Sequence, residues 1–180
     1  MTSIGPNTTL VELAALVSQA LERAGLRATL SGGGAVSVYS ENEYESKDLD
    51  FVSNERLEAI GQAVAPLGFT RVGPGREFEN PETSWYLEFP PGPLAFGETS
   101  IADDEADVLG TDYGPLRIIS PTHVVMDRLA AYVHWRDNPS LDQAVMIARW
   151  QDIDWAALGK WAEREKIASE IISAVKNRSR

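Results

Sequence analysis

The segment Ser31-Gly32-Gly33-Gly34-Ala35 is followed, a short loop later, by the segment Ser46-Lys47-Asp48-Leu49-Asp50-Phe51-Val52. The first segment predicts a glycine-rich turn, where the backbone can approach a phosphate closely. The second predicts a buried strand on which Asp48 and Asp50 share a face, because residues i and i+2 of a strand point the same way. Two adjacent carboxylates repel each other, and a divalent cation such as Mg²⁺, which prefers oxygen ligands, removes the conflict. A phosphate cradle beside metal-binding carboxylates is typical of nucleotide chemistry.

The composition limits the kinds of protein that this chain can be. Its 180 residues, 43% of them hydrophobic, are enough for one core or for a core with a helical appendage. The formal net charge of −11 argues against a protein that coats nucleic acid, because phosphate binding needs Lys and Arg. A local basic site for an NTP or an RNA end remains compatible with that charge.

Cysteine and histidine usage narrows the chemistry further. The chain has no cysteine, which excludes disulfides and thiolate metal sites, and its two histidines, His123 and His134, are too few for a usual zinc site. Residues 1–6 lack the basic start and apolar core of a signal peptide. No apolar run approaches the ~20 residues needed to cross a bilayer, so we expect a cytoplasmic protein without a membrane partner.

The first half of the chain predicts helices and strands in alternation. Thr9 and Glu12 have the spacing of a capping box, and apolar residues at helical spacing follow as far as Ala24, with Gly25 as the stop. The later patterns predict a strand at 27–31, a short helix at 35–39, a polar loop at 40–46, the strand at 48–52 and a helix at 53–67.

A later strand supplies a third carboxylate. Residues 83–89 alternate, with Trp85, Leu87 and Phe89 on one face and Tyr86 and Glu88 on the other. Further strands are predicted at 69–72 and 115–119, whereas 94–112 shows no clear pattern.

The pattern changes from period 2 to period 3.6 at Ser120-Pro121, a good N-cap followed by proline at the first helical position. Helices are predicted over about 121–137, 140–151 and 154–177, the last broken near Lys166, and Trp150, Trp155 and Trp161 are expected to pack among them. The sequence therefore predicts an α+β fold. Residues 1–119 form a small mixed sheet flanked by helices, and residues 120–180 form a C-terminal helical region.

This order of parts resembles the DNA polymerase beta-like nucleotidyltransferase superfamily, and within it the small bacterial nucleotidyltransferases that include AbiEii-type toxins of toxin–antitoxin pairs. Gly32-Gly33 matches the family's glycine motif, and Ser46-Lys47-Asp48-Leu49-Asp50 matches its Asp-x-Asp metal motif. Ser120-Pro121 and Arg128-Leu129-Ala130-Ala131 resemble a later part of the family pattern. The chain departs from it by carrying Glu88 where relatives usually have Asp, and by lacking a basic residue at 40–46.

The resemblance implies a metal-dependent enzyme that moves NMP from an NTP to a hydroxyl of a tRNA, a protein or a small molecule. Asp48, Asp50 and Glu88 would be the catalytic residues and would bind Mg²⁺ or Mn²⁺, and Glu88 would help to deprotonate the acceptor. The implied phosphate-binding residues are Ser31, Gly32, Gly33, Ser46 and Lys47. A cognate antitoxin is the implied protein partner.

Other interpretations of the same residues remain open. The second hypothesis is a non-catalytic module that binds a nucleotide or a partner protein on the same fold, and a third, weaker one is an ordinary α+β domain whose motif match is chance. Lys47 also fits a solvated charge, and Arg128 fits either a phosphate ligand or a partner of Asp127. Glu88 discriminates between these readings, because catalysis requires its carboxylate to converge on Asp48 and Asp50.

Overall fold

The computed structural model of the chain describes residues 4–40 and 43–180. Residues 1–3 of the N-terminus, and residues 41 and 42 of the predicted loop 40–46, lie outside the described residues. The helices are α1 (Leu10–Arg23), α2 (Gly32–Tyr39), α3 (Leu57–Val64), α4 (Pro121–Trp135), α5 (Asn138–Trp150), α6 (Trp155–Arg164) and α7 (Ser169–Arg178), with 3₁₀ turns at Ala65–Leu67 and Asp103–Glu105. The strands are β1 (Thr29–Ser31), β2 (Asp48–Val52), β3 (Thr70–Arg71), β4 (Glu77–Glu79), β5 (Tyr86–Glu88), β6 (Ala95–Phe96), β7 (Thr99–Ser100), β8 (Asp107–Thr111) and β9 (Gly114–Ile118).

One mixed sheet organises the first two thirds of the chain. Its strand order is β3-β4-β5-β2-β1-β9-β8, and β6 and β7 form a separate hairpin. Strand β2 pairs antiparallel with β1 and parallel with β5, while β1 pairs parallel with β9. The α+β class predicted from the sequence is therefore confirmed, and the acidic strand β2 lies inside the sheet between β1 and β5.

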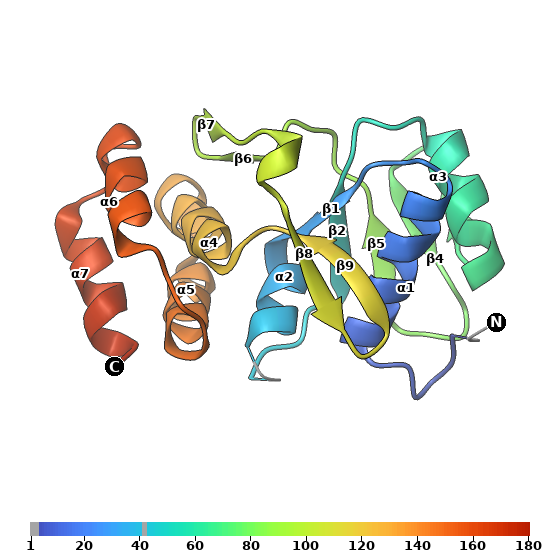
Figure 1. Ribbon diagram of the computed structural model, residues 1–180, viewed down its shortest axis with the longest axis horizontal. Helices are drawn as coiled ribbons and strands as arrows, with labels where there is room; N and C mark the ends of the chain where they lie inside the picture. The colour runs from blue at the N-terminus through green and yellow to red at the C-terminus, as the bar shows by residue number, and fades with distance from the viewer. Residues whose placement is uncertain (1–3, 41–42) are drawn as a thin grey trace.

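Helices cover the two faces of this sheet unequally. Helices α1 and α3 lie at one side of the sheet, and α2 followed by α4–α7 lies at the other (Figure 1). The side chains of Leu49, Phe51, Phe78 and Leu87 are fully buried. Gly61 of α3 approaches Phe78 closely, which places the apolar face of β2, β4 and β5 against the α1–α3 side. The opposite face of these strands carries the acidic side chains.

The N-terminal elements follow the predicted pattern, with one informative difference at the glycines. Thr9 caps α1 by accepting a hydrogen bond from the Glu12 N–H, and β2 has the predicted bounds 48–52. However, α2 begins at Gly32 and not at residue 35. The predicted glycine turn is thus the first turn of the helix itself, and Gly32 enters it with φ of 59°.

Local hydrogen bonds explain why two predicted elements are shorter than expected. Ser53 donates its hydroxyl to the Arg27 carbonyl and its N–H to the Pro90 carbonyl, so the predicted helix 53–67 begins only at Leu57. Thr83 accepts a hydrogen bond from the Trp85 N–H in a turn, so the predicted strand 83–89 is limited to β5. Periodicity alone cannot detect such side-chain bonds.

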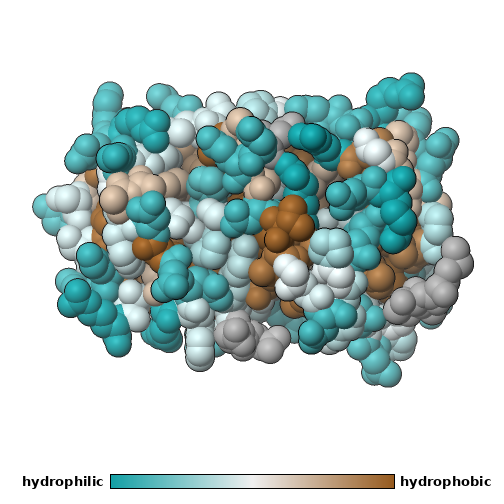
Figure 2. Space-filling view, viewed as in Figure 1, coloured by the Kyte–Doolittle hydropathy of each residue, from teal (hydrophilic) through white to brown (hydrophobic). Residues whose placement is uncertain are grey.

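Several short strands were not expected from the sequence. Strand β4 lies between the predicted strands, and the unassigned stretch 94–112 holds β6, β7 and β8. Strand β8 is an exposed sheet edge with Val108 62% accessible, so it lacks the apolar alternation of a half-buried strand. The face in Figure 2 is mostly hydrophilic, with an apolar patch near its centre in the region of β8 and β9.

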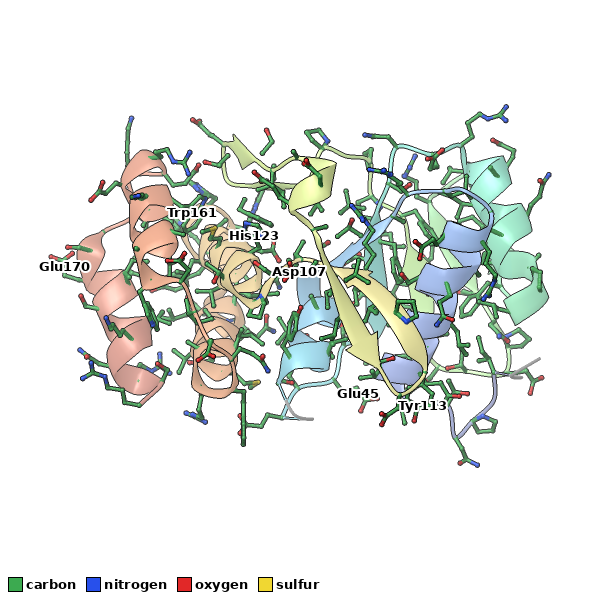
Figure 3. The ribbon with its side chains drawn as sticks, in the orientation of Figure 1. Glu45, Asp107, Tyr113, His123, Trp161 and Glu170 are labelled. Carbon is green, nitrogen blue, oxygen red and sulfur yellow. The ribbon has the colours of Figure 1, made fainter. Side chains whose placement is uncertain are left out.

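The C-terminal third is helical, as predicted. The Ser120 hydroxyl accepts a hydrogen bond from the His123 N–H at the start of α4, and the predicted break near Lys166 falls between α6 and α7. Trp161 is buried beside α4, where Figure 3 labels it near His123, whereas Trp150 is 47% exposed and does not pack as expected. The division into regions 1–119 and 120–180 remains a prediction. Among the described residues, no helix combines the length and apolar character needed to span a bilayer.

A clasp joins the β6–β7 hairpin to the helices. The Glu165 carboxylate, at the end of α6, accepts hydrogen bonds from the Thr99 hydroxyl at 2.5 Å and from the Glu98 N–H at 2.9 Å. The Trp161 indole N–H donates to the Phe96 carbonyl at 3.1 Å. These bonds tie a segment that directly follows the sheet strand β5 to the last third of the chain.

We expect Ser120→Ala to lower the free energy of unfolding by about 1 kcal/mol, because it removes the N-cap of α4. Urea denaturation followed by circular dichroism measures this loss. Ser120→Asp, which retains a capping oxygen, should recover most of it. An unchanged midpoint for Ser120→Ala would show that this cap does not stabilise α4.

Candidate active site

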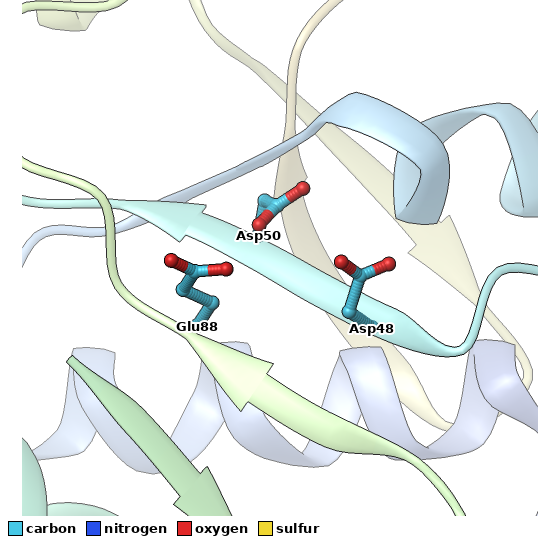
Figure 4. A group of neighbouring side chains, drawn as sticks. All are labelled: Asp48, Asp50 and Glu88. Atoms are coloured by element: carbon cyan, nitrogen blue, oxygen red, sulfur yellow. The ribbon is translucent and has the colours of Figure 1, made fainter. Parts of the chain in front are cut away.

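Three carboxylates from two neighbouring strands converge on one face of the sheet. Asp48 and Asp50 project from β2 and Glu88 from β5, and each offers an oxygen that lies within 4.8 Å of the other two (Figure 4). All three side chains are only partly exposed. The carboxylate of Glu88 thus converges on those of Asp48 and Asp50, as the catalytic hypothesis requires.

The sheet register explains the convergence. In the parallel pairing of β2 with β5, Asp50 is the partner of Glu88 and Asp48 is the partner of Tyr86. In the antiparallel pairing of β1 with β2, Asp50 is the partner of Ser31, the last residue before the glycines. Directly paired residues on adjacent strands have neighbouring side chains, so the register alone brings the glycine turn and Glu88 to Asp50 from opposite sides.

The cluster is electrostatically costly without a counter-charge. Burial, and then the charges of Asp48 and Glu88, raise the pKa of Asp50 from 3.8 to about 7, while Arg128 acts to lower it. The pKa of Tyr86 is also raised, chiefly by the charge of Asp48. The Tyr86 hydroxyl lies 3.5 Å from Asp48 Oδ2, at the limit of a hydrogen bond.

Arg128 of α4 is the cation whose charge acts on this cluster. Its guanidinium donates to Asp127 Oδ2 at 2.6 and 3.1 Å and to Gln143 Oε1 of α5 at 3.3 Å, and its side chain is 15% exposed. The sequence left Arg128 open between a phosphate ligand and a partner of Asp127. The ion pair with Asp127 is present, and it holds the guanidinium where its charge also acts on Asp50.

The glycines permit a very close approach of α2 to the acidic strand. A Cβ at Gly32 would lie 2.5 Å from Asp50 Oδ2, and one at Gly33 would lie 2.7 Å from the Ser46 hydroxyl. Gly32 also has a positive φ, which strains any other residue. Only glycine therefore fits beside Asp50 at this point without a shift of the carboxylate.

The remaining predicted phosphate-binding residues have different surroundings. The Ser46 hydroxyl donates to Asp48 Oδ1 at 2.6 Å, and the Ser46 N–H donates to the Ser37 hydroxyl, so Ser46 orients Asp48. The Ser31 hydroxyl lies 3.4 Å from the Asp50 carbonyl, to which it donates. Lys47 is exposed and makes no side-chain hydrogen bond or ion pair with the described part of the chain.

Two contacts in the site could not be predicted from the sequence: that of Tyr86 with Asp48 and that of Gln143 with Arg128. Tyr86 shares the alternating face of Glu88, so its position followed from the pattern, but its contact with Asp48 depended on the register of β2 with β5. Gln143, which holds Arg128, lies on a different helix and nothing in the local sequence marks it. Contacts between segments distant in the chain are not encoded in local periodicity.

The donor set fits a hard divalent cation. Three carboxylates supply oxygens only, and their mutual separation of at most 4.8 Å needs little closure for ligands at metal–oxygen distances of about 2.1 Å. Burial first, and then the charges of Asp48 and Glu88, raise the pKa of Asp50, and a bound cation would act against both effects. Among the described residues, this is the one group of three or more such ligands close enough to hold a metal ion.

The fold is of the nucleotidyltransferase-like α+β type, as comparison with solved structures shows. A nucleotidyltransferase-like protein from Paracoccidioides brasiliensis is similar with a TM-score of 0.58 and 13% identity over 94% of both chains. ANT(2″)-Ia, solved with adenylyl-2″-tobramycin, is similar with a TM-score of 0.53 and 16% identity over 95% of this chain and 98% of its own. The lincosamide antibiotic adenylyltransferase LnuA, bound to lincomycin, has a TM-score of 0.53 and 17% identity over 78% of this chain and 97% of its own. No family model matches the sequence, and no curated protein matches it by sequence.

The raised pKa of Asp50 predicts that the metal-free protein loses stability as the pH rises from about 4 to about 7. In this range the native carboxyl keeps its proton and the unfolded one has lost it, so the native state binds more protons and the free energy of unfolding falls with pH. After allowance for solvent screening of a partly exposed group, the effect is on the order of 2 kcal/mol.

Asp50→Asn removes this titration and is the matched control. Urea denaturation at several pH values in EDTA should show the wild type losing stability relative to Asp50→Asn between these limits. A pH-independent difference between the two proteins would contradict the prediction.

Gly32→Ala should weaken Mn²⁺ binding at least about tenfold, because its methyl group displaces the Asp50 carboxylate from the cluster. Gly73→Ala is the control, since Gly73 has a similar φ of 57° but nothing within 4 Å of the added Cβ. Isothermal titration with Mn²⁺ compares the two variants. Equal losses would assign the effect to backbone strain and not to the contact with Asp50.

Proposed function

We propose that this protein is a metal-dependent nucleotidyltransferase, which moves NMP from an NTP to a hydroxyl group of an acceptor. The observation that carries the proposal is the convergence of Asp48, Asp50 and Glu88 beside the glycine start of α2, on a nucleotidyltransferase-like fold. Fold similarity alone does not define an activity, so the chemistry of this site has to support it.

Asp48, Asp50 and Glu88 would hold Mg²⁺ or Mn²⁺. A divalent cation bound there supplies positive charge to the phosphate oxygens and polarises the acceptor hydroxyl. Ser46 fixes the orientation of Asp48, and the register of β5 fixes Glu88. The protein thus presents its carboxylates in a preformed arrangement, which lowers the cost of ordering them at binding.

The start of α2 would bind the β- and γ-phosphates. The N–H groups at a helix N-terminus attract anions, and Gly32 and Gly33 leave the backbone open to close approach. Ser31 and Ser46, which bond to the Asp50 carbonyl and to Asp48 Oδ1, would contribute hydroxyl groups there, and Lys47 would contribute a positive charge. Arg128, held from α4, places a positive charge near Asp50 and would help to neutralise the triphosphate.

In the transfer step, the acceptor oxygen forms a bond to the α-phosphorus while the bond from that phosphorus to the bridging oxygen breaks. Pyrophosphate leaves with the electron pair of that bond. The acceptor proton passes to a nearby carboxylate, for which we propose Glu88. Positioning and charge stabilisation would supply most of the rate.

The acceptor and the biological setting follow from weaker arguments. The resemblance to AbiEii-type toxins favours a tRNA or protein acceptor and an antitoxin partner, whereas the net charge of −11 disfavours RNA. Two of the structurally similar proteins are antibiotic adenylyltransferases, which favours a small-molecule acceptor. We also propose that residues 1–119 form the catalytic core and that residues 120–180 form a helical region that supplies Arg128.

A non-catalytic module that binds a nucleotide or a partner is the second candidate. The observation in its favour is the scarcity of positive charge: Lys47 is exposed and makes no ion pair with the described residues, and Arg128 is already paired with Asp127. Such a module would bind an NTP and release it unchanged.

The test combines binding with turnover in wild type and Asp50→Asn. We expect millimolar NTP with Mn²⁺ to raise the melting temperature of the wild type and not that of Asp50→Asn, because a ligand stabilises only the state that it binds. Incubation with each labelled NTP and a panel of tRNA, lysate and small molecules should yield labelled product with the wild type alone. Glu163→Gln, a change of an exposed residue on α6, serves as the control.

The outcomes separate the two candidates. A thermal shift without product from any acceptor would favour the binding module. The absence of a shift with every NTP would overturn both nucleotide hypotheses, and unfolding of Asp50→Asn would show that Asp50 is structural.

A further inference from the structure

A cavity of about 310 Å³ lies between the β6–β7 hairpin, the 3₁₀ turn Asp103–Glu105 and the helices α4 and α6. None of the three carboxylates of the candidate active site lines it, so it is a separate place in the molecule. Its volume is at the lower end of the range of small-molecule sites. Two of its lining side chains, His123 of α4 and Trp161 of α6, lie near each other in Figure 3.

The floor of this cavity is apolar. Phe96, Met126 and Trp161 are buried and line it. The indole N–H of Trp161 is already bonded to the Phe96 carbonyl, so the ring offers the cavity its apolar surface. The His123 ring packs against the Phe96 ring with centroids 5.3 Å apart. The floor therefore suits an aliphatic side chain or a single aromatic ring.

Helix α6 brings two cations to the same cavity. The residues of α6 that line it are Ala157, Lys160, Trp161 and Arg164, a spacing that places them on one face of the helix. Lys160 and Arg164 are exposed, and neither makes a side-chain hydrogen bond or an ion pair within the described part of the chain. Both are therefore available to a carboxylate of a ligand.

Glu105 supplies a negative charge to the cavity. Its side chain is exposed and forms no ion pair with Lys160 or Arg164, although all three line the same space. Burial lowers the pKa of His123 and the charge of Glu105 acts in the opposite direction, so Glu105 lies near the imidazole, which stays neutral at pH 7. Opposite charges that border one cavity without meeting are complementary to a ligand that carries both charges.

The His123 imidazole is a polar group that the described part of the protein does not use. Its Nδ1 atom is buried without a hydrogen-bond partner there, and its other nitrogen makes no hydrogen bond either. The Ser100 hydroxyl, exposed at the same cavity, also makes none with the described residues. Buried polar atoms are normally paired, so this unpaired atom in a lining residue is an independent indication of a polar ligand.

We propose that this cavity binds a free amino acid with an apolar side chain. The carboxylate of the amino acid would lie toward Lys160 and Arg164, its ammonium group toward Glu105, and its side chain over the apolar floor. The inference does not rest on the proposed nucleotide transfer. The binding that it predicts can be measured without nucleotide and without a metal ion.

The test is isothermal titration at pH 7 in EDTA, at about 0.15 M salt, where charges more than about 8 Å apart are largely screened. The probes are L-phenylalanine, 3-phenylpropanoate, which lacks the ammonium group, 2-phenylethylamine, which lacks the carboxylate, and glycine, which lacks the side chain. We expect one L-phenylalanine to bind per chain and each of the other three to bind at least about tenfold more weakly.

Variants that remove charge assign the two ends of the ligand. Lys160→Gln with Arg164→Gln should weaken L-phenylalanine about three- to tenfold and leave 2-phenylethylamine no weaker. Glu105→Gln should weaken L-phenylalanine by a similar factor and leave 3-phenylpropanoate no weaker. Arg180→Gln and Glu163→Gln remove the same charges outside the cavity lining and should change nothing. All five positions are exposed, so the variants are expected to fold, and melting curves check this.

Each of four results would overturn the proposal: no binding of L-phenylalanine at millimolar concentration, equal or tighter binding of 3-phenylpropanoate, equal or tighter binding of 2-phenylethylamine or glycine, or equal losses in the control variants and the cavity variants. The probe series with the wild type decides the first three even where a variant fails to fold. Absence of NMP transfer in a protein that binds L-phenylalanine would count against the proposed function and not against this site.

Discussion

The apolar face of the sheet holds three mutually repelling carboxylates together on adjacent strands, and the arrangement of this protein depends on that constraint. Each strand that enters the cluster is fixed by an apolar residue on its other face, because Leu49, Phe51 and Leu87 are completely buried. The hydrophobic core therefore holds Asp48, Asp50 and Glu88 together, and burial followed by the charges of the other two carboxylates raises the pKa of Asp50. A sheet slipped by one residue would relieve the repulsion but would expose the core, so the cluster persists.

The parts of the site that the sequence predicted are those carried by local periodicity. Strand β2 has the predicted bounds, and the alternation around Glu88 placed that residue on the correct face. The predicted glycine turn proved to be the first turn of α2, where Gly32 lies against Asp50 of β2 and Gly33 lies against Ser46 of the segment that precedes β2. Short or edge strands such as β4 and β8 escaped prediction, since pairing and not composition defines them.

Long-range contacts account for what local patterns could not supply. Gln143 holds Arg128 from a neighbouring helix, and the Glu165 clasp joins the β6–β7 hairpin to α6. Neither contact has a signature within a short window of sequence. The alignment of Asp50, Glu88 and Glu77 across β2, β5 and β4 likewise depends on the strand register, which a short window of sequence does not give.

The raised pKa of Asp50 also has a consequence for how the site would be loaded. Near neutral pH a proton occupies this carboxyl for part of the time, and a divalent cation that enters the cluster has to displace it. Metal binding would then exchange a proton on Asp50 for a metal ion, and the proton would be released to the solvent. A lower pH and a lower magnesium concentration would consequently act on the same carboxylate oxygens, and each would reduce the fraction of the protein that holds a metal ion.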